Sequence, residues 1–289
     1  YALDEVRSIR LQGVYRLDRN TPLSTDAFNL TKPTQFANLT KPTQFAGQAG
    51  ALVAYVFDNT RERMMNIPEG TRYRIWAEYY INPNESEATF GTVGFDVRMY
   101  KPLWRNVIWA NRLAADWSIG AQRLLHMVGG VDNTLSLIAN AQSPIDPSIN
   151  YAYQTRLAPL RGFNANARNG SHMALFNSEL RIPLWSTLSS RPVDTELLQT
   201  LQCVGFFDVG SAWNGKHPYD NANTFNQVTI TQNPITVTID NNREPVIWGT
   251  GFGFRGKVLG YWLRADWSWG VDDGRWQDRV FNLSLELDF

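Results

Sequence analysis

The chain has 289 residues, of which 43% are apolar and 19% are charged, a composition typical of neither a disordered chain nor a helical membrane protein. Basic and acidic residues number 27 each, so the formal net charge is zero and no overall field favours nucleic acid or an acidic membrane surface. The single cysteine, Cys203, excludes an internal disulfide and a metal site built from several cysteines.

Membrane-spanning helices are not expected, because no apolar stretch approaches the roughly 18 residues that such a helix requires. The most apolar segment, Ala51–Phe57, is much too short. The first residues, Tyr1–Glu5, lack the basic and apolar regions of a signal peptide, so we expect a processed or truncated chain. Aromatic residues make up 13% of the sequence and include 11 Trp, and membrane barrels carry such residues in girdles at both interfaces.

Segments of alternating apolar and polar residues run through the whole sequence, each near the length that a tilted membrane strand requires. No long helical pattern interrupts them. In chain order they are Ser8–Asp18, Gln48–Asp58, Thr71–Asn82, Phe90–Lys101, Asn106–Gly120, His172–Leu184, Thr200–Gly210, Pro245–Arg255, Tyr261–Trp269 and Arg279–Phe289. We therefore expect an all-β chain folded as a transmembrane antiparallel β-barrel, with about ten strands present.

The last of these segments shows the alternation most clearly, because every second residue from Phe281 to Phe289 is apolar and the residues between them are polar. Other segments carry charges of both signs on the polar face, among them Arg264 and Asp266. A water-soluble β-sandwich would alternate as well, but its exposed faces are usually less aromatic. We expect the apolar faces to contact lipid and the charged faces to enclose the interior.

The connections between the segments differ greatly in length, as in barrels that have short turns at one end and long external loops at the other. Residues 257–260 predict a tight turn. Residues 121–171 and 214–244 are long, rich in Asn, Pro and Gly, and expected to be external loops, although 228–240 could form a hairpin of its own. A nine-residue direct repeat within 29–46 is a tandem duplication tolerated in another loop, and we assign it no function.

Short motifs follow one another in the longest loop and in the two segments after it: Leu160–Phe163, Asn177–Leu184 and Phe206–Gly210. Together with the C-terminal aromatic segment they resemble the bacterial surface antigen family, the barrel domain shared by BamA, TamA and two-partner secretion transporters. In that family an Arg-Gly-Phe or Arg-Gly-Tyr tip on a long external loop folds back into the barrel lumen. The likeness covers most of the chain, and Gly129–Asn133 is similar to members from Bacteroidota, which often carry a TolB-like β-propeller upstream.

The resemblance implies a role for each matching residue. Arg161 would be the tip arginine, Gly162 and Phe163 would complete the tip, and Glu179 and Asp208 would be its acidic partners on the next two strands. Both acids lie at alternating positions that belong to the polar face of their segments, so we expect their side chains to point inward. A guanidinium offers a rigid fork of donors that suits carboxylates. The remaining expected site residues are Phe206 and Gly210 in the strand motif and Phe289, which resembles the terminal aromatic residue that assembly machinery recognises.

Two departures from the family's pattern bear on the expected function. Family barrels have about sixteen strands, so the resemblance implies that the ten expected here are the C-terminal part of a sixteen-stranded barrel. We therefore expect the first strands and the periplasmic domains to be missing from this sequence. Members that insert other barrels often have a glycine in the last strand, where it permits a kink and a lateral opening. Arg279–Phe289 contains none, which puts insertase activity in doubt.

The resemblance implies a non-enzymatic protein of the outer membrane of a Gram-negative bacterium. It would act in insertion or translocation of other outer-membrane proteins, or as the membrane-embedded subunit of an envelope complex. Its expected partners are outer-membrane lipid and either client barrels or the other subunits of such a complex, without nucleic acid or a cofactor. A passive pore, in which the charges of the lumen set ion selectivity, is the alternative.

An enzyme such as a barrel phospholipase or protease is a second alternative, and it would need a nucleophile with an oriented base. Ser171 directly precedes His172, but neighbouring strand residues point to opposite faces. The other histidines, His126 and His217, lie far from it in the sequence, so we expect neither a catalytic pair nor a metal site. Cys203 has the parity of the apolar residues on its segment and is expected to face lipid.

Overall fold

The computed structural model describes residues 1–20, 44–64, 67–83, 85–135, 140, 143, 145–146, 149–188, 195–223, 225–232, 235–241 and 243–285. Most of the nine-residue repeat and the last four residues, which include Phe289, lie outside the described residues. The expectations for the repeat and for the terminal aromatic therefore remain predictions.

One large antiparallel sheet dominates the structure, and ten of its strands overlap the ten segments predicted from the alternation. Nine of them have 12 residues or more, and the last has five. They are β1 (Arg7–Asn20), β2 (Gln44–Asp58), β4 (Ile67–Asn82), β5 (Glu85–Trp104), β6 (Val107–Gly120), β10 (His172–Pro183), β11 (Gln202–Trp213), β14 (Ile247–Val258), β15 (Tyr261–Asp272) and β17 (Val280–Ser284). Two short strands, β3 (Arg61–Met64) and β16 (Arg275–Trp276), pair antiparallel with β4 and β15. The expected all-β antiparallel fold is confirmed.

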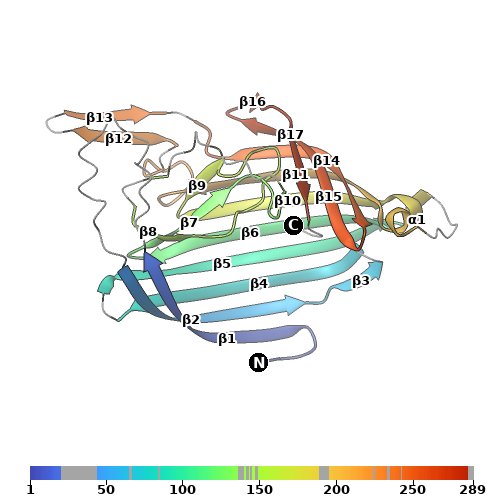
Figure 1. Ribbon diagram of the computed structural model, residues 1–289, viewed down its shortest axis with the longest axis horizontal. Helices are drawn as coiled ribbons and strands as arrows, with labels where there is room; N and C mark the ends of the chain where they lie inside the picture. The colour runs from blue at the N-terminus through green and yellow to red at the C-terminus, as the bar shows by residue number, and fades with distance from the viewer. Residues whose placement is uncertain are drawn as a thin grey trace.

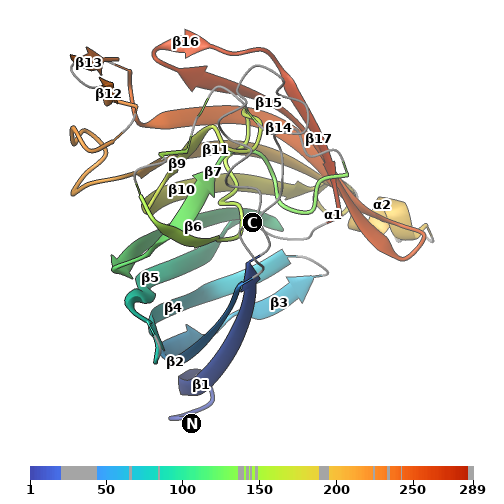
Figure 2. The same cartoon turned by 60° about the vertical axis from the view of Figure 1, so that its left-hand side comes forward.

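The sheet is strongly curved, and β1 and β17 form its two edges (Figures 1 and 2). Within the described part of the chain β1 does not pair with β17, so the barrel is not closed. β17 pairs with β15, and its residue Ser284 also forms a bridge with Thr134 of the long loop. Figure 2 shows that the long loop lies on the concave side of the sheet.

The two faces of the sheet have the opposite polarity to those of a water-soluble protein, with apolar side chains outside and polar ones inside. Outward apolar side chains are exposed, including Leu11 at 72%, Leu113 at 47% and Phe252 at 44%. Inward polar side chains are buried, and Asp266 and Ser268 are both 0% exposed. A β-sandwich packs its apolar faces against each other in a dry core. The sandwich alternative is therefore wrong, because here the apolar face points away from the interior and the charged face encloses it.

The segment 121–171 fills the concave side with a small sheet of its own (Figure 2). Its central strand β7 (Arg123–Val128) pairs in parallel with β8 (Tyr151–Gln154) and antiparallel with β9 (Arg168–Gly170). The predicted hairpin in the next long connection is present as β12 (Gln227–Gln232) and β13 (Ile235–Asp240).

Helices are short. α1 (Leu184–Leu188) and α2 (Glu196–Thr200) lie between β10 and β11. Among the described residues, no helix has the length and apolar character needed to cross a membrane.

Candidate functional site

Backbone hydrogen bonds hold the end of the long loop in a compact turn that enters the concave side. The amide of Gly130 donates to the carbonyl of Phe163 at 3.0 Å, and the amide of Leu160 donates to the carbonyl of Gly130 at 3.1 Å. The backbone of Gly130 therefore holds both ends of the tip Leu160–Phe163 in place. Because the tip is tied to its own loop, its position does not depend on side chains alone.

The backbone of the tip lies directly against β14 and β15, and glycines make this approach possible. Gly162 has φ +96°, and a Cβ atom there would lie 2.7 Å from the amide nitrogen of Gly270. A Cβ atom at Gly249 would clash with the carbonyl oxygen of Arg161, and one at Gly270 would lie 2.5 Å from that of Gly162. Any side chain at these three positions would push the tip away from the wall.

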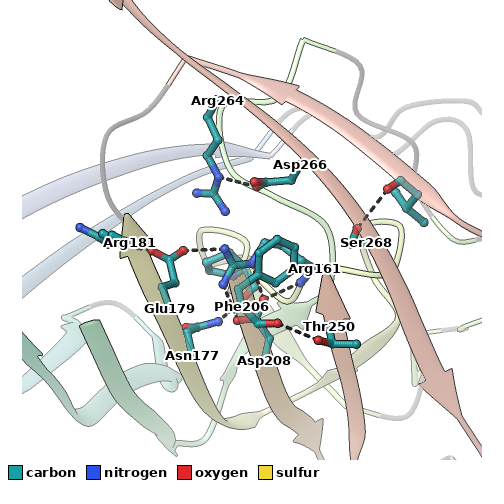
Figure 3. Close-up of polar contacts among 12 residues, drawn as sticks. Arg161, Asn177, Glu179, Arg181, Phe206, Asp208, Thr250, Arg264, Asp266 and Ser268 are labelled. Carbon is teal, nitrogen blue, oxygen red and sulfur yellow. Dashed lines mark hydrogen bonds and ion pairs between the residues drawn. The ribbon is translucent and has the colours of Figure 1, made fainter. Parts of the chain in front are cut away.

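Arg161 makes the central polar contacts of the site (Figure 3). Its Nε and Nη2 donate to Oδ2 and Oδ1 of Asp208, both at 2.6 Å, and its backbone amide donates to Oδ2 at 3.0 Å. Its Nη1 donates to Oε1 of Glu179 at 2.5 Å, and its guanidinium carbon lies 3.7 Å from the centre of the Phe206 ring. The arginine is thus bound by two carboxylates and stacked on an aromatic face.

Glu179 is shared among three arginines. Besides Arg161, it accepts from Nε of Arg181 at 2.8 Å and from Nη2 of Arg255 at 2.6 Å. All these side chains are buried, so none is compensated by bulk water. Next to them, Arg264 contacts Asp266 (Figure 3). The site is therefore a network of buried charges that connects the loop to β10, β11 and β14, with the ion pair of β15 beside it.

The balance of burial and charge fixes the protonation of the tip arginine. Burial alone would lower the pKa of Arg161, but Asp208 and then Glu179 attract the cation and raise its pKa well above its ordinary value. The guanidinium is therefore charged near pH 7, and its two carboxylate partners are buried with it.

An apolar cluster packs beside the charges. Phe163 is 7% exposed and lies in a cluster with Leu160, Val128, Leu175 and Ile247, which come from the tip, the loop and two strands of the wall. Burial of each such side chain contributes about 1.5–3 kcal/mol. The tip is therefore anchored by an apolar contact on one side and by ion pairs on the other.

A second buried arginine of the same loop, Arg168, contacts β15 and the connection between β11 and β14. It contacts Asp272 at 2.5 Å and donates to the carbonyl oxygens of Glu244 and Pro245 at 2.8 and 3.2 Å. Its guanidinium carbon lies 4.5 Å from the centre of the Phe225 ring. Arg168 thus ties the long loop to the following long connection and to the end of β15.

The structure brings together most of the residues that the sequence singled out. Arg161, Gly162, Phe163, Glu179, Asp208 and Phe206 form one site, and Gly210 lies next to the side chain of Leu160. The sequence reasoning missed Arg168, Arg255, Gly249 and Gly270. Arg255 carried a usable signal, because its parity on an alternating segment is that of an inward-pointing residue.

His126, a candidate base for enzyme chemistry, does not form a hydrogen-bonded pair with the neighbouring acid. His126 of β7 is buried, with Nδ1 3.1 Å from the hydroxyl of Thr155 and Nε2 3.9 Å from the carboxylate of Asp116. Burial lowers the pKa of His126 to about 4, so the ring is neutral near pH 7. The distance to Asp116 exceeds that of a hydrogen bond. In the described part of the chain, no group of three or more His, Cys, Asp or Glu residues could hold a metal ion.

No family model matches the sequence, and no curated protein matches it. Among solved structures, the chain is similar to BamA from Haemophilus ducreyi lacking POTRA domains 1–3, with a TM-score of 0.56 and 14% sequence identity. The fold is similar to that of a BamA barrel. The match covers 97% of this chain and 52% of the BamA chain, so this chain spans about half the length of that structure. At this identity the likeness is one of fold.

Proposed function

We propose that this chain is an outer-membrane β-barrel protein of a Gram-negative bacterium. The inverted sheet supports this proposal, because an apolar outward face is stable in hydrocarbon and a charged inward face is stable only when it is enclosed. Outer-membrane lipid is then the partner of the outward face. The likeness in fold to BamA supports the same location.

Within that membrane, the proposed role is insertion or translocation of other outer-membrane proteins, or that of the membrane-embedded subunit in an envelope complex. The observation that carries this role is the loop tip, which is bound to the concave wall through Arg161 and Phe163. A passive pore needs an unobstructed interior, whereas here a buried and ion-paired loop occupies it. The protein partners are client barrels or the other subunits of the complex.

Folding of a client barrel into liposomes tests the insertion role. Liposomes that contain the full-length protein should accelerate the folding of a small urea-unfolded outer-membrane barrel, measured as the gel shift between its unfolded and folded forms. Liposomes with an unrelated barrel at the same protein-to-lipid ratio are the control. Equal folding rates in the two preparations would contradict insertion and leave the role of a complex subunit, which cross-linking in native membranes would examine.

Conductance across a planar bilayer distinguishes the plugged barrel from a pore. The proposal predicts low conductance for the wild-type protein, with more frequent open events in Arg161→Ala because the tip loses its contacts to Asp208 and Glu179. A large steady current through the wild-type protein would contradict a plugged interior.

A further inference from the structure

A polar pocket lies away from the arginine site, between the connection that follows β11 and the turn between β15 and β16. Its volume is about 540 Å³, within the range of about 300–1,000 Å³ typical of small-molecule sites. It is lined by Tyr219, Asn226, Gln227, Asp240 and Glu244, among others. The β12–β13 hairpin, whose two ends contribute Gln227 and Asp240, projects beyond the end of the large sheet (Figure 1).

Hydrogen bonds among the lining residues hold the pocket in shape. The hydroxyl of Tyr219 donates to Oε1 of Glu244 at 2.5 Å, and Nε2 of Gln227 donates to Oδ1 of Asp240 at 2.7 Å. Nδ2 of Asn226 donates to two carbonyl oxygens of its own connection, both at 2.9 Å. Below them, the buried Arg168 fixes the backbone of Glu244. The site is therefore organised before any ligand arrives.

These internal bonds leave the pocket rich in acceptors. The hydroxyl hydrogen of Tyr219, one amide hydrogen of Gln227 and both amide hydrogens of Asn226 are used in these bonds. Among the described contacts, the side-chain carbonyl oxygens of Gln227 and Asn226 accept no hydrogen bond. Asp240 and Glu244 each accept through one oxygen in these contacts, so a second carboxylate oxygen remains for a ligand. A matching ligand must therefore supply many donors, as a molecule with several hydroxyl groups does.

Charge and shape narrow the class of ligand further. The lining contains three carboxylates, those of Asp240, Glu244 and Asp273, against one guanidinium, that of Arg243, so phosphate and sulfate groups are disfavoured. The ring of Tyr219 is accessible, because this residue is 58% exposed. An aromatic face beside acceptors suits a pyranose, whose C–H face packs on the ring while its hydroxyls donate to oxygens.

We propose that this pocket binds a neutral or amino sugar of a glycan, with Tyr219 as the stacking platform. Asp240, Glu244 and Gln227 accept hydrogen bonds from the sugar hydroxyls, and Arg243 donates to a ring or glycosidic oxygen. The sequence predicts that the long connections are external loops, so the glycan would be one met at the cell surface. This binding does not depend on whether the barrel inserts other proteins.

Binding of the full-length protein in detergent micelles to an array of immobilised oligosaccharides tests the proposal. The array carries neutral, amino and sulfated glycans, and we expect signal on neutral or amino sugars only. Tyr219→Ala should reduce it at least tenfold, whereas Tyr219→Phe should retain most of it because the ring remains. Tyr261→Ala is the matched control, since Tyr261 is also an accessible tyrosine, 69% exposed, at the start of β15.

The outcomes that would overturn the proposal are distinct. Absence of glycan binding, binding confined to sulfated glycans, or undiminished binding by Tyr219→Ala would each do so. Binding of an oligolysine peptide in place of the sugars would instead assign the carboxylates to a cationic partner. Gel mobility of unheated samples shows whether each variant is folded, so a folding defect cannot be mistaken for loss of the site.

Discussion

Arg161 is the residue on which the loop position depends most, because it makes a double contact with Asp208 and a further contact with Glu179. Removing one partner of a buried ion pair leaves the other charge uncompensated and costs about 3–5 kcal/mol. We therefore expect Arg161→Ala to lower the free energy of unfolding by an amount of this order. Urea titration of the protein in detergent micelles measures it.

The control for this substitution is Arg156→Ala, because Arg156 lies in the same loop and is exposed. Loss of an exposed charge should change the free energy of unfolding by less than about 0.5 kcal/mol. If both variants unfold at the urea concentration that unfolds the wild-type protein, the contacts of Arg161 do not stabilise the barrel.

Gly162 allows the effect of close approach to be separated from that of backbone strain. Alanine at a residue with positive φ costs of order 1–3 kcal/mol wherever it lies. Gly260, with φ +85°, has open space around it, whereas a Cβ at Gly162 would meet the backbone of Trp269 and Gly270 within 2.8 Å. We expect Gly162→Ala to destabilise the protein clearly more than Gly260→Ala in the same urea titration. Equal effects would mean that the tip does not press on the wall.

At the scale of elements, the strands were predictable and their mutual contacts were not. Period-two alternation predicted the nine long strands and the shorter β17, because each has one apolar and one polar face. Glu179 and Asp208 were predictable from the motifs around them. Gly249 and Gly270 were not, because they matter only where the tip crosses β14 and β15. Arg255 reaches Glu179 from a position 76 residues away in sequence, so no local pattern pairs them.

Two buried arginines of the long loop contact different parts of the structure, Arg161 at the tip and Arg168 nearer to β10. The contacts of Arg168 involve Asp272 and the carbonyls of Glu244 and Pro245, none of which belongs to the tip. We expect Arg168→Ala to accelerate amide hydrogen exchange in residues 168–170 and 243–246 about tenfold or more, equivalent to ~1.4 kcal/mol. Amides around the tip should keep their protection.

The matched control is Arg275→Ala, since Arg275 lies at the same end of the sheet but is exposed. It should leave exchange in both ranges unchanged. Equal acceleration at the tip and around residue 168 in Arg168→Ala would show that the loop moves as one unit and that the two anchors are not independent.

At the scale of the whole molecule, the inversion of the sheet makes a prediction that separates a membrane protein from a water-soluble one. Leu113 lies in the middle of β6 and is 47% exposed. In a soluble protein, arginine at such a surface position changes stability by about 0.5 kcal/mol or less. On the lipid face near the bilayer midplane, the same change costs about 2–4 kcal/mol. Leu113→Arg should therefore reduce the stability of the protein folded in liposomes by the larger amount, measured by reversible urea titration.

Leu259→Arg is the control, because Leu259 is 91% exposed in the turn between β14 and β15, where a charge remains in water. Equal, small effects of both substitutions would contradict contact between the apolar face and hydrocarbon.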